Sequence, residues 1–139
     1  SYRFVIKTAS CSLFLPILIT LPKDASDSLK AHEEGHLHIN QYFYKQYAEA
    51  AIKNAAGALI GKQYTIEAPT YEEAKKMLVP ATVKEVQQMY RAQTYTPAEK
   101  ANVIYDSLTD HGRKTEVSPE TAAAQAIKEV EQTAAAVSR

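Results

Sequence analysis

Three of the four histidines in the chain fall within seven residues, at positions 32, 36 and 38. Because an α-helix turns by about 100° per residue, His32 and His36 would lie about 40° apart, one turn above the other on the same face. Two imidazoles in this relation can bind one metal ion. His38 would lie about 200° from His36, on the far side of the helix, and we expect it to be a surface histidine outside the site.

The residue after the first of these histidines is Glu33, so that residues 32–36 read HEEGH. This matches the HExxH pattern, in which both histidines bind zinc and the glutamate takes a proton from water at the metal. The pattern also arises by chance, so a third ligand is needed to support it. Gly35 costs a helix interior about 1 kcal/mol relative to alanine. A close approach of another group to the backbone at this point would explain the glycine.

A third ligand has to come from another part of the chain. Glu49 is excluded because thirteen residues of the same helix separate it from His36, about 20 Å along the axis. Five later side chains remain as candidates: Glu72, Glu73, Asp106, Asp110 and His111. Glu73 is already explained as a helix-capping residue. His111 is our first choice, because it lies in a glycine-containing loop from which a side chain can turn toward the first helix.

The elements that would position these side chains are indicated by apolar and capping residues. Residues 2–20 are rich in β-branched and aromatic residues and predict two strands, the second broken or confined to a sheet edge by Pro16. Capping residues at 24–27 predict a long helix that carries the histidines and ends at Gly57. Residues 62–68 predict a short strand or an extended connection.

Further helices are predicted for the rest of the chain. Thr70 caps a helix that Pro80 would end or kink, and the helical pattern resumes behind the proline. A second helix begins with Thr96 as its cap, and a final one with Ser118 as its cap. His111 lies in the loop between these two helices.

The composition limits the class of protein. A chain of 139 residues favours one domain, covering residues 1–139. The 16 basic residues balance the 16 acidic ones, so no net charge would attract nucleic acid. The longest apolar run, residues 13–21, is too short for a transmembrane segment, which needs about twenty apolar residues. The single cysteine, Cys11, excludes an internal disulfide, and we expect it to pack in an apolar strand.

Two separated segments, HEEGHLHI at 32–39 and YDSLTDHG at 105–112, resemble the paired motifs of a bacterial family. That family was long catalogued as a domain of unknown function, and its members are predicted secreted zinc-dependent proteases. Its first motif reads roughly HEQGHFDI and its second roughly YDxxTxHG. In this chain Glu34 replaces the glutamine and His38 replaces the aspartate, both on the helix face away from the expected metal.

The resemblance implies a site with three histidine ligands to Zn²⁺: His32, His36 and His111. It also implies that Glu33 is the general base and that Tyr105 and Asp106 lie beside the metal. There Tyr105 would donate a hydrogen bond to a developing oxyanion, and Asp106 would orient a ligand histidine. A core aromatic residue is an equally good interpretation of Tyr105, and a turn residue an equally good one of Thr109.

We therefore expect an α+β, zincin-like domain with a small N-terminal β-sheet over the long HExxH helix and further helices packed beneath it. The expected function is that of a zinc metallopeptidase acting on a peptide or protein substrate. The alternative is a non-catalytic zinc-binding or helical interaction domain of the cell envelope. An extended substrate is expected to pair with the edge of a strand at residues 13–20.

The resemblance also implies an extracytoplasmic protein, either periplasmic or secreted. The chain opens at Ser1 without a methionine. We therefore expect an export signal to have been removed.

Overall fold

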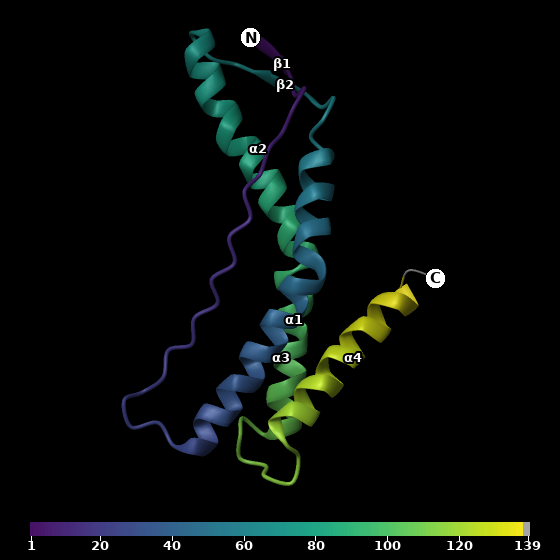
Figure 1. Cartoon of the computed structure of the whole chain (residues 1–139). Coiled ribbons are helices and arrows are strands. Elements are labelled where there is room, and N and C mark those ends of the chain that lie inside the picture. The colour runs from purple at the N-terminus through teal and green to yellow at the C-terminus, as the bar shows by residue number, and fades with distance from the viewer. Residues whose placement is uncertain (138–139) are drawn as a thin grey trace. The chain divides into compact units, whose positions relative to one another are not determined.

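The computed structural model describes residues 1–137 (Figure 1). The elements in chain order are β1 (Tyr2–Val5), α1 (Asp27–Gly57), β2 (Gln63–Ile66), α2 (Tyr71–Gln93), α3 (Tyr95–Thr109) and α4 (Pro119–Val137). The fold is α+β, with a small two-stranded sheet and several packed helices, as the sequence predicted.

Contacts divide the chain into two compact units. The first unit contains residues 1–14 and 47–93, and the second contains residues 15–46 with the described residues from Thr94 onward. Helix α1 therefore supplies residues to both units. The expectation of one domain over residues 1–139 concerns the whole chain and stays a prediction.

The sheet of the first unit pairs β1 with β2 in antiparallel order, with Tyr2 opposite Ile66. Tyr2 and Phe4 alternate along β1 and both contact the ring of Tyr71, at centroid distances of 5.8 and 5.6 Å. The first residue of α2 thereby contacts this small sheet. Of the two alternatives for residues 62–68, the short strand is confirmed.

The prediction of two strands within residues 2–20 was wrong beyond β1. No strand forms between Val5 and α1, and the side chains of Phe14 and Leu18 are 86% and 88% exposed. Strand propensity reflects packing against neighbouring strands and a core face, and this segment has neither. The proposed pairing of a substrate with a strand edge at residues 13–20 therefore loses its basis. Cys11, expected to be packed, is exposed for the same reason.

Helix α1 begins and ends where the sequence predicted. The Ser26 hydroxyl oxygen accepts a hydrogen bond from the Leu29 backbone N–H at 3.1 Å, and the helix ends at Gly57. Its apolar stripe is buried in both units, with Ile39 and Phe43 in the second and small alanines further along. This burial fixes which face of α1 turns inward, and hence where the histidines point.

Helices α2 and α3 depart from the predicted boundaries. Thr70 caps α2, since its hydroxyl oxygen accepts from the Glu73 N–H at 3.3 Å. Pro80 does not end this helix: α2 continues through the proline to Gln93, and its two buried residues, Ala74 and Leu78, lie before Pro80. Helix α3 begins at Tyr95 rather than after Thr96, so the proline there falls in its first turn, where a missing N–H costs little.

Helix α4 packs against α3 in the second unit (Figure 1). The Ser118 hydroxyl oxygen accepts from the Thr121 N–H at 3.1 Å, which confirms the predicted cap. The buried faces of the two helices are made largely of alanines, which let the backbones approach closely: Ala98, Ala101, Ala122, Ala123 and Ala126. Tyr42 of α1 donates a hydrogen bond to Glu131 of α4.

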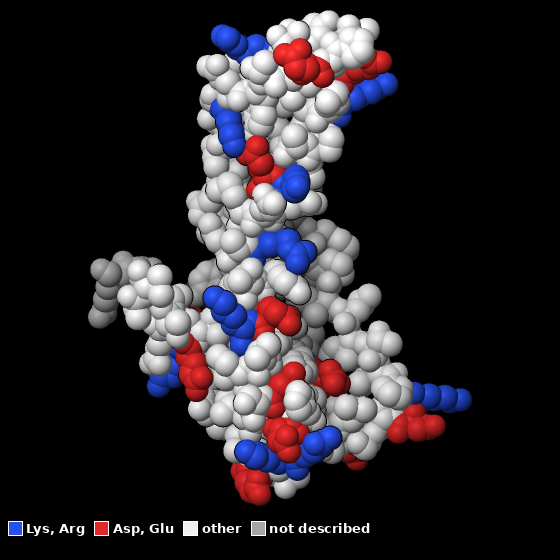
Figure 2. Space-filling view, turned by 180° about the vertical axis from the view of Figure 1, so that it is seen from behind, with Lys and Arg blue, Asp and Glu red and all other residues white. Residues whose placement is uncertain are grey.

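Within residues 1–137, no helix combines the length and apolar character that a membrane crossing requires. On the face in Figure 2, acidic and basic side chains are interspersed. This distribution agrees with the balanced net charge of the sequence.

Candidate metal centre

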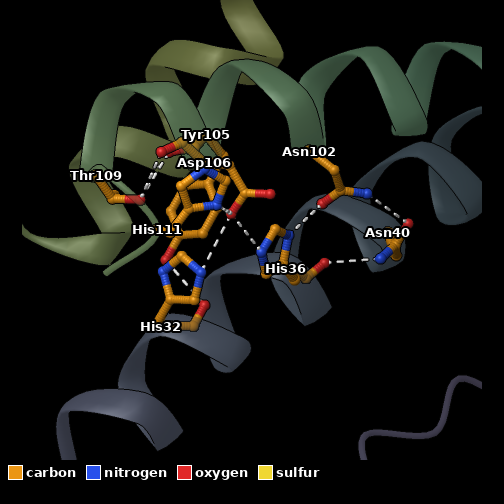
Figure 3. A network of polar contacts seen from close by, with 8 residues as sticks. All are labelled: His32, His36, Asn40, Asn102, Tyr105, Asp106, Thr109 and His111. Carbon is orange, nitrogen blue, oxygen red and sulfur yellow. Dashed lines mark hydrogen bonds and ion pairs between the residues drawn. The ribbon is translucent and has the colours of Figure 1, made fainter. Parts of the chain in front are cut away.

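Two histidines of α1, His32 and His36, face α3 within the second unit (Figure 3). His32 contacts Asp106, and His36 contacts both Asp106 and Asn102. Asn40, one turn further along α1, contacts Asn102, one turn back along α3. Because residue numbers rise along α1 as they fall along α3, the two helix segments are antiparallel, with matching steps of one turn.

Two imidazole nitrogens converge on one carboxylate oxygen. The Asp106 Oδ1 atom lies 3.2 Å from His32 Nε2 and 3.0 Å from His36 Nε2. The ligand atoms that the three residues offer all lie within 4.8 Å of one another. Ligands of a tetrahedral zinc ion with bonds of about 2.0–2.1 Å are separated by roughly 3.3 Å. The spacing and chemistry of these three side chains therefore fit a metal ion, and they form a possible metal-binding triad.

The convergence of two imidazole nitrogens on one carboxylate oxygen limits where the protons of the two rings can be. The carboxylate oxygen of Asp106 can only accept hydrogen bonds when ionised. Each Nε2 beside it must therefore carry a proton, or else direct its lone pair at a shared cation. Two donating rings on one oxygen would make a proton-bound cluster, and two lone pairs would make a metal site.

The side chain of Asp106 is 30% exposed, and those of His32 and His36 are 8% and 21% exposed. Water can therefore reach the Asp106 and His36 side chains. Glu33, half-buried and next to the first histidine, lies close enough to Tyr105 for its charge to act on that hydroxyl.

Tyr105 is fully buried between the two histidines and the backbone of α1. Its hydroxyl donates to the backbone carbonyl of His32 at 2.9 Å, and its ring stacks on the His32 ring at a centroid distance of 5.0 Å. Burial, together with the negative charges of Asp106 and Glu33, raises the pKa of Tyr105 from 10.0 to about 12. The side chain is thus a core aromatic whose hydroxyl is already bonded, and its role toward an oxyanion stays a prediction.

The predicted close approach at Gly35 is confirmed by Tyr105. A Cβ atom placed on Gly35 would lie 2.1 Å from the Tyr105 hydroxyl oxygen and 2.3 Å from Cζ. Only a residue without a side chain leaves room for the tyrosine. This accounts for a glycine in the middle of α1.

The loop after α3 folds back toward α1 through three residues with left-handed backbone conformations. Asp110, His111 and Gly112 have φ angles of 48°, 54° and 83°. The His111 N–H donates to the Asp106 carbonyl at 2.9 Å. A Cβ atom on Gly112 would lie 3.1 Å from Cγ of His32, so the glycine backbone packs on that ring.

His111 lies beside the centre but outside the converging set of ligand atoms. Its Nδ1 atom is 3.8 Å from Asp106 Oδ1, and its side chain is 72% exposed. A left-handed conformation at a residue other than glycine costs about 1–3 kcal/mol and is often found at functional sites. The assignment of His111 as a zinc ligand stays a prediction.

The remaining candidates from the sequence lie elsewhere or serve the fold. The buried Thr109 hydroxyl donates to the Tyr105 carbonyl at 2.8 Å, which is a helix-end contact. Glu72 and Glu73 belong to the first unit, and His38 is exposed on α1, as the helix angle predicted. Asp110 is the C-terminal cap residue of α3.

Two asparagines in the site, Asn40 and Asn102, were missed by the sequence reasoning. Each lies four residues from a recognised site residue, Asn40 from His36 and Asn102 from Asp106. That spacing places them on the same helix faces as the site. Only the pairing of α1 with α3 makes the spacing meaningful.

Comparison of the chain with protein-family models, with curated proteins and with solved structures finds no match. What the fold and site define is an α+β protein with a possible metal-binding triad. Any more particular assignment is therefore a proposal built on the residues of the centre.

Proposed function

We propose that the protein is a zinc-dependent peptidase whose catalytic centre lies between α1 and α3 in the second unit. The observation that carries the proposal is the convergence of His32 Nε2, His36 Nε2 and Asp106 Oδ1 within 4.8 Å of one another. Two imidazoles and one carboxylate are a ligand set common in catalytic zinc sites, which retain an open coordination position.

Asp106 is the third ligand that the geometry favours. Its Oδ1 is already at ligand spacing from both histidines, whereas His111 is directed mainly to solvent. The sequence favoured His111 because of its loop, and Asp106 was expected to orient a ligand. The two assignments make different predictions for metal content when each residue is replaced.

The chemistry follows from the groups around the triad. When bound, zinc supplies a Lewis acid and lowers the pKa of its water toward 7. Glu33, adjacent to His32 in the chain, would take the proton of the attacking water and return it to the leaving amine. Tyr105 remains protonated below pH 10 because its pKa is raised to about 12, and it holds the His32 carbonyl throughout.

Peptide bonds as substrate, and a periplasmic or secreted location, come from the resemblance of the two motifs to predicted secreted proteases. The partial exposure of Asp106 and His36 supports a centre that substrate can reach. A non-catalytic zinc-binding domain is the rival function, and it would use the same three ligands. The role of Glu33 separates the two, because only catalysis requires it.

Metal analysis of protein purified without a nickel column tests the ligands. We expect about one zinc per chain in the wild type, with loss of zinc in Asp106→Ala and retention in the control His38→Ala. Loss in His111→Ala together with full zinc in Asp106→Ala would show that His111 is the third ligand. A wild type that binds no zinc would refute the metal centre.

Hydrolysis of a mixed peptide library, followed by mass spectrometry, tests the catalytic role. Glu33→Gln should retain zinc and lose cleavage, because the amide cannot accept a proton from water at neutral pH. The matched control is Glu34→Gln, one residue further along the helix. Equal cleavage by wild type and Glu33→Gln would exclude Glu33 as the base, and zinc binding without any cleavage would favour the non-catalytic domain.

A further inference from the structure

We propose that Asn102 is a positioning residue for the metal centre, because it fixes which ring nitrogen of His36 faces the metal. The inference rests on the proposed zinc site and deepens it. The contacts that carry it form a closed hydrogen-bonded ring of three residues: His36, Asn40 and Asn102 (Figure 3).

The ring begins at a group whose hydrogen-bonding role is unambiguous. The backbone carbonyl of His36 can only accept, so the side-chain group of Asn40 that lies 2.9 Å from it must be the NH₂ group. The Oδ1 atom of Asn40 then faces the other way, toward Asn102. A backbone atom thus orients the first amide.

The second amide follows from the first. The Oδ1 atom of Asn40 can only accept, so the NH₂ group of Asn102 donates to it at 3.2 Å. The remaining Oδ1 atom of Asn102 lies 2.8 Å from Nδ1 of His36. Since this oxygen also can only accept, His36 Nδ1 must carry a proton.

With its proton on Nδ1, neutral His36 has its lone pair on Nε2. That atom is the one that lies 3.0 Å from Asp106 Oδ1 in the candidate centre. Asn102 therefore selects the tautomer of His36 that can bind a metal through Nε2, and it also fixes the orientation of the His36 imidazole. Partners of this kind raise metal affinity because the ligand need not be reordered on binding.

His32 lacks such a partner. Its Nδ1 atom is buried and accepts or donates no hydrogen bond among the described residues. Packing against Tyr105 and Gly112 orients its ring instead. The two ligand histidines are therefore held by different means, and replacing Asn102 should act on His36 alone.

Zinc affinity, measured by competition with a chromophoric chelator on the full chain, tests the proposal. Asn102→Ala should raise the zinc Kd about 10- to 100-fold. Asn102→Asp keeps an oxygen that accepts from His36 Nδ1, although it loses the donor to Asn40, and should bind zinc more tightly than Asn102→Ala. Asn54→Ala is the matched control, since Asn54 is on α1, the helix that carries His36, but contacts Gln93 in the first unit.

Nitrogen-15 NMR of the histidine rings in the zinc-loaded protein adds a readout that a merely structural role would not change. We expect a proton on His36 Nδ1 in the wild type, and faster exchange of that proton with water in Asn102→Ala. An unchanged zinc Kd in Asn102→Ala, with zinc bound normally by the wild type, overturns the role of Asn102 and leaves the proposed function standing. No zinc binding by the wild type overturns both.

Discussion

Replacing Gly35 with alanine tests how closely α1 and α3 approach at the site. A helical glycine in open space gains about 1 kcal/mol of stability on conversion to alanine. At Gly35 the new Cβ atom would lie 2.1 Å from the Tyr105 hydroxyl oxygen and 2.3 Å from Cζ. Tyr105 is fully buried, so it cannot swing away into solvent.

The expected magnitude follows from what the tyrosine must give up. Moving its hydroxyl breaks the 2.9 Å bond to the His32 carbonyl, worth about 1 kcal/mol. Forcing the ring into a packed core costs about 1–3 kcal/mol more. Against a gain of about 1 kcal/mol from helix propensity, Gly35→Ala should be destabilised by about 1–3 kcal/mol.

Urea denaturation followed by circular dichroism, with a chelator present throughout, measures this without any metal contribution. Gly57→Ala is the matched control, because a Cβ atom at this end of α1 has nothing within 4 Å. We expect the control to be unchanged or stabilised by up to about 1 kcal/mol, so the two variants should differ in sign. A stabilised Gly35→Ala would refute the close approach of Tyr105.

Three further predictions concern the same centre. The pKa of Tyr105 is raised from 10.0 to about 12, so its neutral form adds stability that is full below pH 10 and is lost as the pH rises toward 12. In urea titrations over this pH range, the free energy of unfolding should fall by up to about 3 kcal/mol more in the wild type than in Tyr105→Phe. Gly112→Ala should lower the free energy of unfolding by about 1–2 kcal/mol and weaken zinc binding, because φ is 83° and the methyl group would press on His32. Calorimetry measures the stability and chelator competition measures the zinc affinity. Unchanged values for both would contradict the packing of Gly112 on His32. Zinc at a free concentration of 100 times Kd should stabilise the wild type by about 2.7 kcal/mol, and EDTA should reverse the rise in Tm.

The helices could be predicted because their signals are local. Ser26, Thr70 and Ser118 each accept a hydrogen bond from a backbone N–H three residues later, so the sequence around each cap is sufficient. The sheet could not be predicted in the same way. The partner of β1 is β2, across the whole of α1, and nothing in residues 2–20 specifies that pairing.

The site likewise contains residues that local sequence predicts and residues that depend on the packing of distant segments. His32, His36 and Glu33 follow from helical periodicity within five residues. The choice between Asp106 and His111 depends on how far α3 is rotated about its axis and on the loop behind it. Left-handed conformations at two residues other than glycine are not foreseeable from composition, and they leave the His111 side chain largely exposed.

The two sequence motifs, residues 32–39 and 105–112, contact each other in the structure. Tyr105 fills the space that Gly35 leaves and bonds the His32 carbonyl, while Asp106 meets both ligand histidines. Gly112 then packs its backbone on the ring of His32. Because Tyr105 and Asp106 are consecutive residues of α3, a shift of this helix by the width of a methyl group would displace the tyrosine and the carboxylate together. Stability without metal and affinity for zinc should therefore fall in parallel when Gly35 is enlarged.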